Sequence, residues 1–116
     1  MNFSEINESV RPEFERYISY ISKMDGVLRI YLFGSHAYGE PNEFSDIDLF
    51  VVVRNGMDTI KIAQLISLGL CDRQFPIDVL VDTESDFNKL SVPDRVTLQR
   101  EVNERGVLVF GEHRLP

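Results

Sequence analysis

The sequence predicts an α/β protein in which helices pack against a small mixed β-sheet. Some segments carry apolar residues at helical spacing, and others are continuous runs of β-branched and aromatic residues that are typical of buried strands. The two kinds of segment follow one another in the order α-β-β-α-β-α. Strands with long apolar runs need cover, so we expect helices to pack against a mixed sheet.

Length and charge narrow the possible architectures and ligands. The chain has 116 residues, the usual size of one compact domain, so residues 1–116 are expected to form a single domain. Twelve basic residues stand against nineteen acidic ones, and the formal net charge is −7. A broad nucleic-acid groove is therefore not expected, because Lys and Arg supply most of the affinity for a phosphate backbone. A single nucleotide bound with a divalent metal remains compatible.

The sequence carries no sign of secretion or of membrane insertion. Its one cysteine, Cys71, has no partner for an internal disulfide, and the acidic start MNFSEINESV lacks the basic and apolar regions of a signal peptide. No apolar run approaches the roughly 20 residues of a membrane span. We expect a soluble, cytoplasmic protein.

The first two predicted elements are a helix and a strand. Residues 12–24 are expected to form an amphipathic helix, with Pro12 suited to its first turn and Gly26 to its termination. The apolar residues that follow helical spacing are Phe14, Tyr17, Ile18 and Ile21. The run VLRIYLF, residues 27–33, predicts a buried strand that stops in a tight turn at Gly34.

Two more strands and a helix are predicted in the middle of the chain. DIDLFVVV, residues 46–53, is a second strand-like run. Apolar spacing between Asp58 and Leu70 predicts a helix with Asp58 as its N-cap. PIDVLVD, residues 76–82, predicts a third short strand.

The last third of the chain is predicted to contain two short helices and a small strand. Thr83 and Asp86 are both candidates for capping the first of these helices. Pro93 is expected to open the second, which ends near Gly106. VLVF, residues 107–110, is expected to be the final strand.

Three aspartates stand inside or beside these apolar strands. Asp46 and Asp48 point to the same face of their strand, and their mutual repulsion is about 3 kcal/mol at a separation of ~5 Å and an effective dielectric near 20. A divalent cation would offset that repulsion, and Mg²⁺ prefers carboxylate oxygens. Asp78 occupies a similar place in the next strand. If these two strands are neighbours, three carboxylates share a patch that could hold Mg²⁺ ions against phosphate oxygens. The alternative is that the Asp46–Asp48 pair is a solvated turn or a cap.

A glycine and a serine follow the first predicted strand at once. Gly34 lets the backbone turn sharply and approach a phosphate closely, and Ser35 offers a hydroxyl. A short helical turn over residues 36–38 would direct free N–H groups toward the space beside Asp46 and Asp48. The alternative for an isolated Gly-Ser pair is an ordinary turn.

These residues together resemble a known signature. Ten residues separate Ser35 from Asp46, so the chain reads G-S-x10-D-x-D, and GSHAYGEPNEFSDIDLFVV resembles the DNA polymerase beta-like nucleotidyltransferase superfamily. The nearest likeness is to the minimal nucleotidyltransferases, called MNT proteins. PIDVLV resembles the strand that holds the third carboxylate in that superfamily, and EVNERGVLVF resembles its final helix and strand.

The resemblance implies a nucleotidyltransferase fold and a set of residue roles. Gly34 and Ser35 would hold the triphosphate of a nucleotide, and Asp46, Asp48 and Asp78 would be the catalytic residues and Mg²⁺ ligands. An acceptor oxygen would attack the α-phosphorus of a nucleoside triphosphate and pyrophosphate would leave. Many MNT proteins resemble antitoxins that pair with a HEPN-domain toxin. We therefore expect a Mg²⁺-dependent transferase that moves AMP from ATP to a hydroxyl of such a partner.

Other assignments remain open. The protein could act as a non-catalytic antitoxin that blocks its partner sterically, or as a small-molecule nucleotidyltransferase of the aminoglycoside type, and it could form an oligomer. Asp82 competes with Asp78 for the third role, although Asp78 lies inside the apolar run. The basic residues after the third strand are interspersed with acidic ones, which favours a salt-bridged helix face over a phosphate site.

Overall fold

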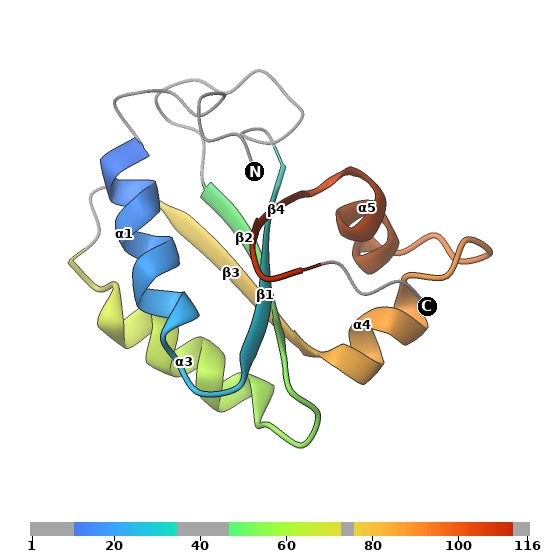
Figure 1. The fold of residues 1–116 in the computed structure, drawn as a ribbon, viewed down its shortest axis with the longest axis horizontal. Helices are drawn as coiled ribbons and strands as arrows, with labels where there is room; N and C mark the ends of the chain where they lie inside the picture. Colours follow the sequence, from blue (N-terminus) through green and yellow to red (C-terminus); the bar gives the residue numbers. More distant parts are fainter. Residues whose placement is uncertain (1–10, 35–46, 73–75, 113–116) are drawn as a thin grey trace.

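A four-stranded mixed sheet organises the protein (Figure 1). The structure is a computed structural model that describes residues 11–34, 47–72 and 76–112. In chain order its elements are α1 (Arg11–Ser22), β1 (Val27–Phe33), β2 (Ile47–Val53), α3 (Thr59–Gly69), β3 (Ile77–Thr83), α4 (Glu84–Leu90), α5 (Leu98–Arg105) and β4 (Val107–Phe110). The predicted α/β class, with a small mixed sheet packed against helices, is confirmed.

The strands lie in the order β3-β2-β1-β4. β1 runs antiparallel to both of its neighbours, β2 and β4, whereas β2 and β3 are parallel. Parallel neighbours need a crossover connection, and α3 provides it between β2 and β3. The second and third strands are therefore neighbours, which is the condition under which their aspartates share one patch.

Two predicted helix caps are present. The Asp58 side chain accepts a hydrogen bond from the backbone N–H of Lys61 at 3.1 Å, at the start of α3. The Thr83 hydroxyl accepts one from the N–H of Asp86 at 3.3 Å, so Thr83 rather than Asp86 caps α4. Each cap satisfies an N–H group that the first helical turn leaves without an intrahelical partner.

The start of the last helix was predicted wrongly. The helix begins at Leu98 and not at Pro93. Thr97 caps it by accepting the N–H of Arg100 at 3.0 Å, and the same hydroxyl donates to the carbonyl of Leu90. Proline is tolerated in several turn positions, whereas a side-chain cap with this second contact stabilises one starting point.

Two smaller boundary errors have local causes. The first helix ends at Ser22, two residues before the predicted limit, and a turn with Gly26 at φ +86° leads into β1. The third strand spans Ile77–Thr83 instead of 76–82, because pairing with β2 continues to the residue that caps α4. Helix and strand ends commonly shift by one or two residues in this way.

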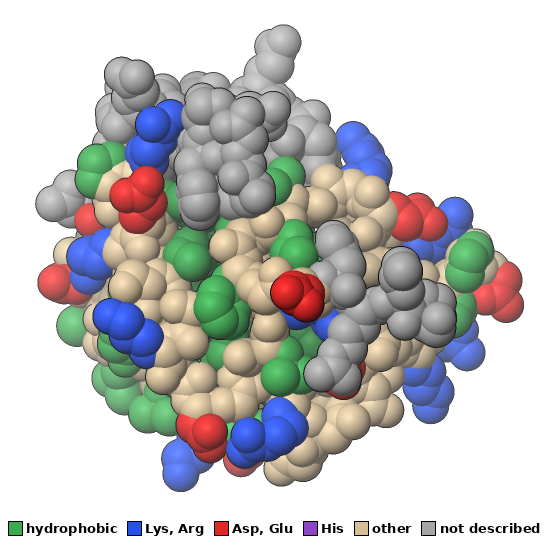
Figure 2. All heavy atoms as spheres, in the orientation of Figure 1, with side chains coloured by type: hydrophobic (Ala, Val, Ile, Leu, Met, Phe, Trp, Pro, Cys, Tyr) green, Lys and Arg blue, Asp and Glu red, His purple; other side chains and the backbone are tan. Residues whose placement is uncertain are grey.

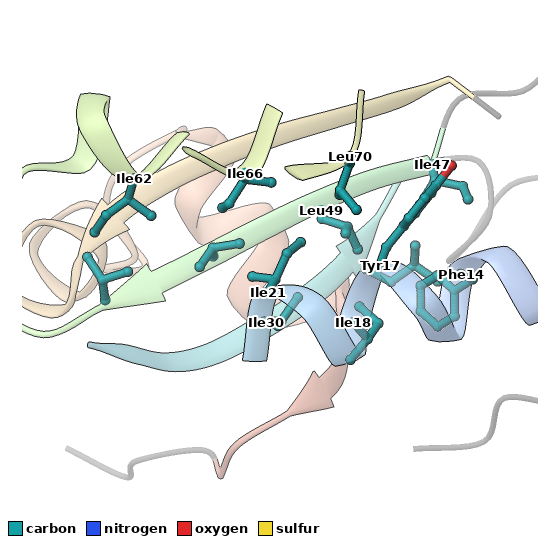
Figure 3. Packing of buried hydrophobic residues seen from close by; sticks show 13 residues of the cluster. Phe14, Tyr17, Ile18, Ile21, Ile30, Ile47, Leu49, Ile62, Ile66 and Leu70 are labelled. Carbon is teal, nitrogen blue, oxygen red and sulfur yellow. The ribbon is translucent and has the colours of Figure 1, made fainter. Parts of the chain in front are cut away.

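The larger part of the core lies between the sheet and the helix pair α1 and α3 (Figure 3). Helix α1 contributes the four apolar residues predicted from its spacing, and all four are buried. Ile62 and Ile66 extend from α3 toward β2. Leu49 of β2 belongs to the same cluster and is fully buried.

A smaller apolar cluster covers the opposite face of the sheet under α4 and α5. Its buried members are Tyr31, Phe33, Phe50, Val52, Phe87 and Val102. Arg29, in β1, is 3% exposed and forms an ion pair with Glu84 of α4 at 3.2 Å. Its guanidinium also lies 5.7 Å from the centre of the Phe87 ring. A buried, paired charge of this kind holds α4 against the sheet, since removing one partner would leave the other uncompensated.

Candidate active site

Asp48 and Asp78 lie directly opposite each other on neighbouring strands. The parallel register of β2 and β3 pairs Ile47 with Ile77 and Asp48 with Asp78. Paired residues of adjacent strands direct their side chains to the same face, and the strands are about 4.8 Å apart. Two of the three predicted carboxylates are therefore placed side by side by the sheet.

The face that holds these carboxylates is the one that α4 and α5 cover only in part. Phe50 and Val52, which follow Asp48 on this face, are buried under Phe87 and its neighbours. Asp48 is half-buried, whereas Asp78 is exposed. The pair therefore stands at the margin of a packed cluster, with one residue half-buried and the other exposed to solvent.

Gly34 touches the Asp48 carboxylate with its backbone. It follows Phe33, which pairs with Asp48 across β1 and β2. Gly34 has φ +76°, and a Cβ placed on it would lie 2.2 Å from Oδ2 of Asp48. A side chain at this position would be strained by the backbone and would collide with the carboxylate. Glycine is thus required where the chain turns beside the acidic pair.

Part of the predicted site lies outside the described residues. Ser35, Asp46 and the helical turn expected over residues 36–38 belong to the segment 35–46, so their placement stays a prediction. Among the described residues, no group of three or more His, Cys, Asp and Glu side chains could hold a metal ion. The three-carboxylate site accordingly depends on Asp46 joining Asp48 and Asp78.

Asp82, the alternative to Asp78, has a structural contact. It pairs in register with Val52, four residues along β3 from Asp78, and its Oδ2 accepts a hydrogen bond from Nε2 of Gln99 at 3.1 Å. Four residues of strand span about 13 Å. Asp82 is therefore too far along the strand to share an ion with Asp48, which favours Asp78.

Two of the basic residues after β3, Arg100 and Arg105, form ion pairs, as predicted for a salt-bridged helix face. Arg100 is 3.2 Å from Glu104, and Arg105 is 3.6 Å from Glu101, both at i, i+4 spacing on α5. Figure 2 shows Lys and Arg side chains scattered among Asp and Glu on one face of the molecule, with none of the described ones gathered into a broad basic patch on that face.

Leu80 is a neighbour of the site that the sequence analysis did not single out. It lies between Asp78 and Asp82 on the same face of β3 and is 41% exposed. The segment PIDVLVD could have indicated that Leu80 lies on the face of Asp78, because every second residue of a strand shares a face. The sequence did not indicate that β3 is an edge strand of the sheet formed by the described residues.

A comparison with protein families identifies the chain. The family described as "Polymerase beta, Nucleotidyltransferase" matches residues 15–114. The chain belongs to this nucleotidyltransferase family. The predicted resemblance to the polymerase beta-like superfamily is thereby confirmed, and the matched region includes Gly34, Ser35 and all three aspartates.

Several solved structures share the fold of this nucleotidyltransferase. A crystal structure of a toxin–antitoxin with AMP-PNP is 21% identical, with a TM-score of 0.53 over 87% of this chain and 73% of the other. A putative nucleotidyltransferase from Sulfolobus solfataricus is 23% identical, with a TM-score of 0.53 over 73% and 75% of the two chains. A mutant of the toxin–antitoxin MntA-HpeT is 19% identical, with a TM-score of 0.51 over 87% and 73%.

One further comparison and the helix lengths complete the description of the chain. The search of curated proteins found no significant match to this nucleotidyltransferase. None of the helices in the described part of the chain is both long and apolar enough to cross a bilayer.

Proposed function

We propose that this chain is a Mg²⁺-dependent nucleotidyltransferase that transfers AMP from ATP to a hydroxyl of a partner protein. The observation that carries the proposal is the pairing of Asp48 with Asp78 on adjacent strands, beside the turn at Gly34. Family membership supports the reaction class. The base of the nucleotide and the nature of the acceptor follow from the resemblance to MNT proteins.

The described residues fit a divalent cation bound to a nucleotide. Asp48 and Asp78 supply carboxylate oxygens on one face of the sheet, and the absence of a side chain on Gly34 leaves room for the Asp48 carboxylate against the backbone. Together with Asp46, these are the residues that would hold Mg²⁺, which supplies neutralisation of phosphate charge when bound. Gly34 and Ser35 would approach the triphosphate from the turn after β1.

The two described carboxylates suit different roles because their surroundings differ. Asp48 is enclosed beside Gly34, where it can keep a fixed position relative to the triphosphate. Asp78 is exposed and can be reached by an acceptor from solvent. In the transfer the acceptor oxygen forms a bond to the α-phosphorus, the bond from that phosphorus to the bridging oxygen breaks, and pyrophosphate leaves with the bonding electrons. The hydroxyl proton passes to the carboxylate of Asp78.

The proposed partner is a HEPN-domain toxin, which would make this chain an antitoxin. Two of the similar structures are toxin–antitoxin assemblies, one of them with AMP-PNP. Those findings concern proteins about one-fifth identical to this chain, and they support the partner class by analogy.

A transfer assay tests the proposal. The chain is incubated with Mg²⁺, ATP labelled at the α-phosphate, and the protein encoded by the adjoining reading frame. We expect label on that protein, and Asp48→Asn or Asp78→Asn should abolish it. Persistent transfer by the Asp48→Asn, Asp78→Asn double variant would overturn the catalytic assignment. Silencing of the toxin by a variant with all three aspartates neutralised would instead support steric inhibition.

A further inference from the structure

β3 is an edge strand that carries one of the proposed catalytic residues. Among the described strands it pairs with β2 alone, because the sheet order β3-β2-β1-β4 places it at one end. Side chains alternate between half-buried and exposed over Ile77–Leu80, whereas Leu49–Val53 of β2 are all buried. The strand that holds Asp78 therefore forms one edge of the described sheet.

Backbone groups of Val79 and Val81 point away from β2. The Ile47 N–H donates to the carbonyl of Pro76 at 2.9 Å, and Ile47 lies opposite Ile77. In a parallel ladder, every second residue of a strand directs both its N–H and its C=O to the same neighbouring strand. The even-numbered residues of β3 therefore bond to β2, and the odd-numbered ones present their polar groups at the outer edge.

This edge contains few of the features that protect strands from further pairing. Ile77–Thr83 includes neither Lys nor Pro, and its register with β2 runs without a bulge. Lys, Pro and bulges are the usual means of blocking an exposed edge. An edge without them can accept one more strand, which gains main-chain hydrogen bonds.

We infer that the acceptor binds as an extended segment added to the outer edge of β3, with its Ser, Thr or Tyr hydroxyl beside Asp78. This inference rests on the proposed function and names how the acceptor is held. An added strand would lie about 4.8 Å from β3, so a residue opposite Asp78 would share its face. The acceptor residue, Asp78 and Asp48 would then form one row across three strands, which brings the hydroxyl to the carboxylate that takes its proton.

The side chains of β3 indicate which segment would fit. On the face of the site, Leu80 is exposed between Asp78 and Asp82. An apolar residue two positions from the acceptor hydroxyl would cover Leu80, and acidic residues nearby would be repelled. The expected occupant is an extended segment of another protein with a hydroxyl residue, an apolar residue at i±2 and neutral or basic neighbours.

A second copy of this chain fits the edge poorly. Antiparallel pairing of two β3 strands centred on Leu80 would place Asp78 of one copy opposite Asp82 of the other. Like charges directly opposite in a sheet are destabilising, and each chain carries a formal net charge of −7. Charge complementarity therefore favours a different protein at this edge.

Hydrogen exchange by NMR tests the inference without any substitution. The amides of Val79 and Val81 should exchange at least tenfold more slowly when the protein encoded by the adjoining reading frame is added. The amide of Leu80 is already bonded to β2 and should change much less. Binding of that protein with no added protection at Val79 and Val81 would overturn the inference, even if transfer occurs.

A proline substitution provides the functional test. Val81→Pro removes an outward N–H and leaves the bonds to β2 in place, whereas Val81→Ala keeps the N–H and reports the loss of side-chain packing. We expect Val81→Pro to transfer at least tenfold less AMP than Val81→Ala while binding Mg²⁺–ATP within threefold of the wild-type affinity by calorimetry. Equal transfer by the two variants would overturn the inference.

AMP transfer and acceptor binding at the β3 edge can be tested separately. No transfer by the wild-type chain, with or without edge protection, would overturn the proposed function and this inference with it. Wild-type transfer that is insensitive to Val81→Pro would overturn only the edge assignment. If Val81→Pro does not fold, the exchange rates of Val79 and Val81 in the wild-type complex decide the matter.

Discussion

The neighbouring strands β2 and β3 differ in their surroundings although they run in register and each carries an aspartate at its second position. β2 lies inside the sheet, and every residue from Leu49 to Val53 is buried. β3 lies at the edge, and its residues are half-buried or exposed. The paired aspartates differ in the same way, since Asp48 is half-buried and Asp78 is exposed.

Under the proposed function, this contrast would allow one small sheet to serve two substrates. A nucleotide would need a fixed carboxylate beside a phosphate-binding turn, and Asp48 of β2 lies next to Gly34. A protein acceptor would need access from solvent, and Asp78 of β3 is exposed. Substitutions on and beside the two strands can test whether they differ in stability and in role.

The largest effect is expected from removal of the carboxylates. Asp48→Asn and Asp78→Asn should each lower the single-turnover transfer rate at least a thousandfold, about 4 kcal/mol on the barrier. Asp48→Asn should also weaken Mg²⁺–ATP binding by calorimetry, and Asp78→Asn should weaken it less. An equal loss of nucleotide affinity in both variants would mean that the strands do not divide these roles.

A matched pair of leucines measures the difference in stability. Leu49 is fully buried in β2, whereas Leu80 on β3 is 41% exposed. Leu49→Ala should reduce the free energy of unfolding by about 3 kcal/mol, and Leu80→Ala by less than about 1 kcal/mol. Urea denaturation of both variants checks this. Comparable losses would show that β3 is covered in solution.

Gly34→Ala should destabilise the protein by about 2 kcal/mol, because a Cβ would meet the Asp48 carboxylate and the backbone has φ +76°. Gly56→Ala is the control, since Gly56 has φ +88° and a Cβ added there would meet no atom within 4 Å. Urea denaturation should show a smaller loss for Gly56→Ala. Equal losses would mean that only the backbone conformation matters and that the Asp48 contact is of no consequence.

The smallest expected effect is a loss of stability at alkaline pH, which arises from Tyr31 on the sheet face away from α1. Burial of Tyr31 raises the pKa of its phenol above its ordinary value of 10.0, although Arg29 acts in the opposite direction. The unfolded chain then loses this proton at lower pH than the folded chain, so stability falls as pH rises from about 10 through the folded-state pKa. Stability measured from pH 9 upward should fall less steeply in Tyr31→Phe. An unchanged slope would contradict this assignment.

Local signals in the sequence predicted most elements but not their pairing. The first strand, 27–33, was placed correctly from its composition, and Asp58 was identified as a cap because capping depends on residues three apart. The last helix was misplaced because its start depends on the contact of Thr97 with the distant carbonyl of Leu90. Sequence periodicity describes one segment at a time and cannot report a contact between residues of different segments.

The candidate site could likewise be predicted only in part from the sequence. Alternation within a strand predicted that Asp48 shares a face with its neighbours two positions away. The register that sets Asp48 against Asp78, thirty residues later, required the structure. The contact of Gly34 with the Asp48 carboxylate was also invisible in the sequence, where only the turn was predicted.

Asp48 is proposed to hold a metal-bound nucleotide, and unfolding measured with and without that ligand tests this role. The free energy of unfolding is measured in urea for wild type and Asp48→Asn, without ligand and with Mg²⁺–ATP at a hundred times the wild-type dissociation constant. We predict that the variant alone is at least as stable as wild type, that ligand adds about 2.7 kcal/mol to wild type, and that it adds almost nothing to the variant. Equal stabilisation of both proteins would contradict the account.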